Sequence, residues 1–147
     1  MPYPGVRIRF DFCAQADLLD LIQSVADHLS RTGGLDDEAT HWVGVAVREG
    51  VVNAIRHGCR DDTTKRITVE LGLEPPEKPV ELVVRVIDPG EGFDPDDVAD
   101  PLAEENLLKP TGRGIFFMRR MMDDVTLRRP PEGGMEVRMV KRLRPAV

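Results

Sequence analysis

Apolar and polar residues follow two different spacings along this chain, and one of them predicts the strands. Alternation of apolar with polar residues has the period of a half-buried strand. It predicts strands over residues 6–12, 66–73, 80–88, 125–128 and 136–143. The segment 80–88 is the most apolar of these, so we expect it in the centre of the sheet. Because short turns join neighbouring strands in pairs, hairpins and an antiparallel or mixed sheet are favoured.

Helical spacing of apolar residues marks three other segments. The first covers residues 17–29 and ends at the Gly33-Gly34 pair. The second begins at Asp36 or Asp37, either of which can cap it, and continues to about residue 57. The third covers residues 114–122. Three aromatic side chains on apolar helix faces are expected in the core: Trp42, Phe116 and Phe117.

The order of these elements indicates the fold class. One strand, two helices and two strands are followed by a long polar segment, a helix and two closing strands. Helices arranged in this way cover one face of a mainly antiparallel sheet. We therefore expect an α+β fold, a two-layer α/β sandwich whose sheet is mixed but mostly antiparallel. The 147 residues suit one domain that spans 1–147.

Charge and composition narrow the partners and the compartment. A formal net charge of -6 argues against nucleic acid as a partner, because its phosphates require a cationic surface. Basic residues do crowd the C-terminal end, where a solvated strand edge is the simpler interpretation. Cys13 and Cys59 form neither a CxxC nor a metal-ligand pattern, which suits a reducing compartment. Without a signal peptide or an apolar run of about 20 residues, we expect a cytoplasmic protein and no membrane partner.

Two polar residues on the second predicted helix have the chemistry of a Mg²⁺ and nucleotide site. Glu49 and Asn53 are four positions apart, so they share a helix face with Cβ atoms roughly 6 Å apart. An amide oxygen suits Mg²⁺, and a carboxylate one turn earlier can orient or deprotonate a hydroxyl group or water. A solvated helix face is the alternative, and for this pair alone it is the commoner one. His57 continues the stripe and either contacts a nucleotide or caps the helix end.

Asp88 ends the most apolar predicted strand and is followed by Pro-Gly-Glu-Gly-Phe. A carboxylate in this place can accept a hydrogen bond from an exocyclic amine such as that of adenine. Gly90 and Gly92 would let a flat ligand approach the backbone. A plain Asp-Pro-Gly turn is the alternative.

The polar, proline-bearing segment that follows has the length of a functional lid, which we place at about residues 94–111. At its end, Thr111, Gly112, Arg113 and Gly114 open the third predicted helix. Backbone N–H groups at a helix N-terminus attract anions, and Lys109 adds positive charge nearby. The segment therefore predicts a phosphate-binding turn, with a flexible helix entry as the alternative.

The order of these motifs resembles the GHKL (Bergerat-fold) ATP-binding domain. ExxxNAxxHG on a helix, DxGxGF after a strand, a polar lid, and GRGI opening an apolar helix span residues 49–122. The segments EGVVNAIRHG and TGRGIFFMRRMMDDV look like those of stand-alone anti-sigma-factor serine/threonine kinases. The resemblance implies an ATP-binding protein that binds a sigma factor, or phosphorylates a small antagonist protein on Ser or Thr, in a partner-switching circuit. It also implies a homodimer.

The resemblance also implies a role for each matching position. Asn53 would bind Mg²⁺ between the phosphates of ATP, and Glu49 would act as the general base. Asp88 would bond the adenine amino group, with Gly90 and Gly92 seating the base. The remaining positions would hold phosphates at the hinge of the lid: Lys109, Thr111, Gly112, Arg113 and Gly114.

One position departs from the pattern of the resembled family. Many relatives have Thr soon after a late Gly-Gly turn, where it helps an ordered water to reach adenine. Here Met135 and Glu136 follow Gly133-Gly134. This difference keeps an alternative open, a nucleotide-gated protein-binding module without kinase activity.

Overall fold

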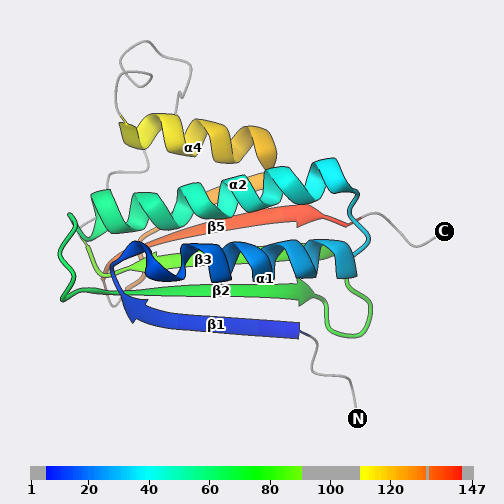
Figure 1. The fold of residues 1–147 in the computed structure, drawn as a ribbon, viewed down its shortest axis with the longest axis horizontal. Coiled ribbons are helices and arrows are strands. Elements are labelled where there is room, and N and C mark those ends of the chain that lie inside the picture. Colours follow the sequence, from blue (N-terminus) through cyan, green and yellow to red (C-terminus); the bar gives the residue numbers. More distant parts are fainter. Residues whose placement is uncertain (1–5, 91–109, 132, 144–147) are drawn as a thin grey trace.

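A computed structural model describes residues 6–90, 110–131 and 133–143 of the chain, which form a two-layer α/β sandwich (Figure 1). The helical layer contains α1 (Leu19–Thr32), α2 (Asp37–Asn53) and α4 (Pro110–Met121), with short helices at Ala16–Leu18 and Ala54–Gly58. The strands are β1 (Val6–Cys13), β2 (Arg66–Glu74), β3 (Glu81–Asp88), β4 (Asp124–Arg128) and β5 (Met135–Arg142). The predicted α+β class is confirmed.

The sheet has the order β1-β2-β3-β5-β4, and each of these four neighbouring pairs is antiparallel. The sheet described is therefore wholly antiparallel, where the sequence left a mixed sheet open. β3 lies in the middle of the order, as its apolar sequence predicts. Its last residue, Asp88, pairs with Met135, the first residue of β5. This pairing brings the Gly133-Gly134 turn to the end of β3 that carries Asp88.

The α-helices α1, α2 and α4 lie on one face of the sheet, and the hydrophobic core fills the space between the two layers (Figure 1). Asp36 caps α2, because its carboxylate accepts a hydrogen bond from the Ala39 N–H at 2.8 Å. α2 lies between α1 and α4 and packs against both. The largest fully buried side chains include Ile22, Leu29, Ile67, Leu71, Leu82, Ile115, Met118 and Met139. In the described parts of the chain, no helix combines the length and apolar character needed to cross a bilayer.

Three expectations about the helices need correction. The regular α-helix ends at Asn53, and residues Ala54–Gly58 form a π-helix instead of continuing it to residue 57. α4 begins at Pro110, four residues earlier than predicted. The expected core aromatics are not buried: Trp42 is 43% and Phe117 45% exposed, and Phe116 is half-buried. On α4 the buried face is taken by Gly114, Ile115 and Met118, which leaves Phe116 half-buried and Phe117 exposed.

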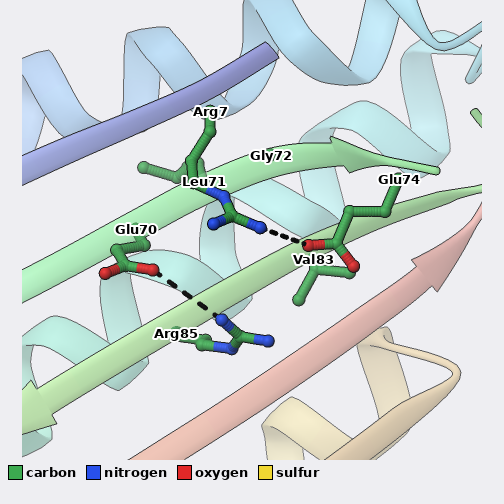
Figure 2. Close-up of a pocket in the computed structure, with 7 residues that line it drawn as sticks. All are labelled: Arg7, Glu70, Leu71, Gly72, Glu74, Val83 and Arg85. Carbon is green, nitrogen blue, oxygen red and sulfur yellow. Dashed lines mark hydrogen bonds and ion pairs between the residues drawn. The ribbon is translucent and has the colours of Figure 1, made fainter. Parts of the chain in front are cut away.

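None of the helices in the described parts of the chain covers the second face of the sheet (Figure 1). Oppositely charged side chains pair across neighbouring strands: Arg7 with Glu74 at 3.2 Å and Arg85 with Glu70 at 3.8 Å (Figure 2). Two basic residues near the C-terminal end are paired as well, Arg128 with Glu136 and Lys141 with Asp123. This pairing agrees with the interpretation of these residues as a solvated strand surface.

Candidate functional site

A small cavity lies where the C-terminal end of α2, the end of β3 and the start of α4 meet; the space between its lining residues, open solvent included, is about 320 Å³. Its lining residues come from four separate segments: Gly50, Asn53, Ala54, Gly58, Val86, Asp88, Ile115, Met135 and Val137. Most of them are apolar, and Asn53 and Asp88 supply the polar side chains. An apolar pocket with a few polar groups is typical of a small-molecule site. The structure thus brings together two residues that the sequence singled out.

Asp88 supplies the only acidic side chain among the residues that line this cavity. Its side chain is buried, and Oδ1 accepts a hydrogen bond from the Gly90 N–H at 2.9 Å. Burial raises the pKa of the Asp88 carboxyl, while the Gly90 N–H and the charge of Lys65 oppose that rise. An ionised carboxyl only accepts hydrogen bonds, so this group suits a ligand that carries a donor, such as an amino group.

Asn53 is the last residue of α2, and its side chain lies against the backbone of α4. A Cβ built on Gly114 would overlap the Asn53 amide group, so only glycine allows this approach. The Asn53 Nδ2 atom is buried and has no hydrogen-bond partner among the described residues. Because a half-turn of the amide exchanges its oxygen and nitrogen, the same side chain can present an oxygen to a cation. The donor set therefore fits Mg²⁺ held together with phosphate oxygens.

Glu49 lies one helical turn before Asn53 on α2 and is half-buried. It is not among the residues that line the cavity. Because Glu49 and Asn53 are four positions apart, their side chains still lie on the same side of α2. Glu49 therefore shares a side of α2 with Asn53 but lies outside the set of residues that line the cavity.

The start of α4 provides the N-terminal turn that the sequence predicts for phosphate binding. Thr111, Gly112, Arg113 and Gly114 all belong to the helix, within its first turns. The first four N–H groups of a helix have no partner inside it, and the helix dipole makes this end attractive to anions. The side chains of residues 111–113 lie outside the described part, as do Gly92, Lys109 and residues 94–109 of the predicted lid.

Two glycines that touch Asp88 were not predicted as site residues. Gly58 lies against the Asp88 carboxyl group, and Gly134 lies against its carbonyl oxygen. In the sequence Gly58 ends a helix and closes the ExxxNAxxHG motif without a role of its own, and Gly134 signals only a turn. Met135 follows the Gly133-Gly134 turn, soon after which many members of the resembled family have a threonine, and it is buried and lines the cavity. The place where this chain differs from the resembled family therefore lies directly beside Asp88.

Two other hollows lie on or beside the face of the sheet that no helix covers. The larger, of about 1230 Å³, is open to solvent and lies beside Pro75 and Pro76. The smaller, of about 180 Å³, is bordered by Arg7, Glu70, Glu74 and Arg85 (Figure 2). Neither contains a residue that the sequence predicts for the site. Their arginines face carboxylates, so these hollows have no unbalanced positive charge for phosphate.

The family of the chain follows from a match over most of its length. A family model described as the histidine kinase-like ATPase domain matches residues 12–141. The chain belongs to this family. The histidine kinase-like ATPase domain implies ATP binding, and all the described residues around the cavity lie within the matched range.

Relatives of this histidine kinase-like ATPase domain include anti-sigma factors and serine-protein kinases. The anti-sigma F factor of Bacillus velezensis is 32% identical over 122 residues, which cover 82% of this chain and 80% of the relative. The anti-sigma F factor of Bacillus subtilis is 30% identical over the same length. The serine-protein kinase RsbW of Listeria monocytogenes is 26% identical over 130 residues, 82% of this chain and 78% of the relative.

Solved structures share the fold of this ATPase domain. The RsbU and RsbW domains of a Mycobacterium tuberculosis protein match with a TM-score of 0.64 and 18% identity, over 97% of this chain and 34% of that longer chain. The mycobacterial sensor histidine kinase MprB matches with a TM-score of 0.58 and 15% identity, over 96% of this chain and 100% of that chain. At these identities the likeness concerns the fold alone.

Proposed function

We propose that this protein is an ATP-binding anti-sigma factor and serine/threonine-protein kinase that phosphorylates a small antagonist protein. It would act as a single-domain homodimer in a cytoplasmic partner-switching circuit that regulates transcription. One observation carries the proposal: the buried Asp88 carboxyl and the Asn53 amide line one apolar cavity at the N-terminal end of α4. The relatives named anti-sigma F factor and serine-protein kinase support the biological role.

Each part of the nucleotide meets a matching group in this arrangement. Asp88 accepts a hydrogen bond from the 6-amino group of adenine, and the apolar walls formed by Val86, Ile115 and Val137 cover the ring. The free N–H groups at the start of α4 bind phosphate oxygens. Asn53 would hold Mg²⁺, which supplies positive charge to the phosphates when it is bound.

Glu49 would serve the transfer step from the mouth of the cavity. As the hydroxyl oxygen of a Ser or Thr attacks the γ-phosphorus, the Glu49 carboxylate accepts the hydroxyl proton and ADP leaves with the electrons of the broken P–O bond. The role needs only a positioned carboxylate one turn from Asn53, which α2 provides.

The decisive test mixes the protein with Mg-ATP and candidate antagonist proteins and follows phosphate transfer to Ser or Thr. Glu49→Ala is expected to reduce the transfer rate by about 100-fold or more, within the range of general-base contributions, while Mg-ATP affinity stays within a few-fold of the wild type. Arg48→Ala, on the adjacent exposed position of α2, serves as a matched control. Transfer by Glu49→Ala at the wild-type rate would show that the assigned role is wrong.

A second candidate function is favoured by Met135. Its thioether occupies the wall beside Asp88, where a hydroxyl group would help to bind water and adenine. In that case ATP would act as a switch that sets affinity for a protein partner, without phosphoryl transfer. A partner that is captured only with Mg-ATP and that carries no new phosphate after incubation would favour this candidate. Transfer of phosphate to that partner would exclude it.

A further inference from the structure

Three glycines close around Asp88: Gly90 directly after it, and Gly58 and Gly134 from distant segments. A Cβ built on Gly58 would overlap the Asp88 carboxyl group, and one built on Gly134 would overlap the Asp88 carbonyl oxygen. A Cβ on Gly90 would overlap the carbonyl oxygen of Gly58. The Asp88 carboxyl and the backbone around it therefore fit only because these three positions carry no Cβ, which requires glycine.

The end of α2 is shaped so that Gly58 reaches this place. Residues Ala54–Gly58 form a π-helix, in which the Cys59 N–H donates to the Ala54 carbonyl oxygen at 2.8 Å. The two residues after Cys59, Arg60 and Asp61, have positive φ angles of 52° and 57°. Positive φ costs conformational energy in residues other than glycine, and both such residues and single π-helical turns are concentrated at functional sites. Cys59 itself is fully buried and anchors the segment beside β3.

This packing restricts the orientation of the carboxyl group. Oδ1 accepts a hydrogen bond from the Gly90 N–H at 2.9 Å, and Gly58 is so close that a Cβ on it would overlap the carboxyl group. A carboxylate held in one orientation is a preorganised acceptor, so ligand binding has little side-chain entropy left to lose. It pairs with the 6-amino donor of adenine and faces the 6-oxo acceptor of guanine with an unpaired charge.

We propose that Gly58 is a positioning residue for the nucleotide base, which sets the preference for a 6-aminopurine over a 6-oxopurine by holding the Asp88 carboxylate in place. This inference rests on the proposed function, because it concerns the base that the same cavity binds. Gly58 does so without touching the ligand through a side chain. It acts only by leaving the space in which the Asp88 carboxylate is held.

The test measures the affinities of Mg-ATP, Mg-GTP and Mg-tripolyphosphate by calorimetry for the wild type and for Gly58→Ala. The added methyl group displaces the carboxylate, so ATP affinity is expected to fall by about 10- to 100-fold, the range of a hydrogen bond to a charged group. The affinity for tripolyphosphate, which has no base, stays within two-fold, and the ATP-to-GTP ratio falls toward one. Gly44→Ala, on α2 against the flexible side chains of Gln23 and Asp27, leaves all three affinities unchanged.

A double variant separates positioning from folding. In Gly58→Ala/Asp88→Ala the overlap is removed, so this protein is expected to fold and to bind ATP as weakly as Asp88→Ala alone, with no further loss from the methyl group. If Gly58→Ala alone is unfolded and the double variant is unfolded too, Gly58 serves the fold and the inference is wrong. Equal losses for ATP and tripolyphosphate, or an unchanged ATP-to-GTP ratio, overturn it as well. A wild type that binds no Mg-ATP overturns the proposed function and this inference together.

Discussion

Replacing Asp88 by asparagine is expected to weaken nucleotide binding without lowering the stability of the fold. The two side chains have the same shape, and the amide oxygen of asparagine can still accept the Gly90 N–H that Oδ1 accepts at 2.9 Å. The second position becomes an NH₂ donor, which cannot accept from the amino group of adenine. Loss of a hydrogen bond to a charged group costs about 1.5–3 kcal/mol, so the Kd for Mg-ATP rises by about 10- to 150-fold.

The stability of the same variant is expected to change in the opposite direction. Burial raises the pKa of the Asp88 carboxyl above its ordinary value of 3.8. The folded protein therefore holds this proton more tightly than the unfolded chain, and the free energy of unfolding rises as the pH falls through the raised pKa toward 3.8. At pH 7 the ionised carboxylate opposes folding. Asp88→Asn removes that charge, so its melting temperature equals or exceeds that of the wild type at neutral pH, and its advantage shrinks as the pH falls.

Calorimetry with Mg-ATP at pH 7 and thermal unfolding between about pH 5 and 8 without nucleotide check both parts. Asp62→Asn is the matched control, because hydrogen bonds from Thr64 lower the pKa of this exposed carboxyl. The ionised Asp62 carboxylate adds to the free energy of unfolding, and this contribution is lost as the pH falls. Asp62→Asn is expected to leave the Kd for ATP unchanged. An Asp88→Asn variant that binds Mg-ATP like the wild type would refute the reasoning about the base. One that melts several degrees lower at pH 7 would refute the reasoning about burial.

Two further predictions test other parts of the site. Gly114→Ala places a methyl group where the Asn53 amide lies, so affinity for Mg-ATP is expected to fall at least ten-fold in calorimetry; an unchanged affinity would show that Asn53 does not need its place against α4. Cys59 is fully buried and its thiol pKa is raised to about 11, mainly by burial, whereas Cys13 is half-exposed. A thiol reagent at pH 8 is therefore expected to modify Cys13 first and Cys59 only on unfolding, and rapid modification of both thiols in the native protein would contradict the buried position of Cys59.

Much of the fold could be predicted from local patterns. The period of the apolar residues identified the five strands and three α-helices, because a strand or helix at a core boundary must turn one face inward. Asp36 was recognisable as a cap, since its carboxylate needs only an N–H three residues away. Asn53 and Asp88 were recognisable by chemistry and order, and the structure brings both to one cavity. Those features depend on residues close together in the chain or on the order of short motifs along it.

Other features were decided only by the tertiary structure, because they depend on packing between distant segments. The spacing of α4 showed that it has an apolar face, but packing against α2 and the sheet selected Ile115 and Met118 for burial and left Phe117 exposed. Gly58 and Gly134 look like an ordinary helix end and an ordinary turn in the sequence. They belong to the site because the π-helix and the pairing of β3 with β5 bring them against Asp88, and no local pattern records where separate elements meet.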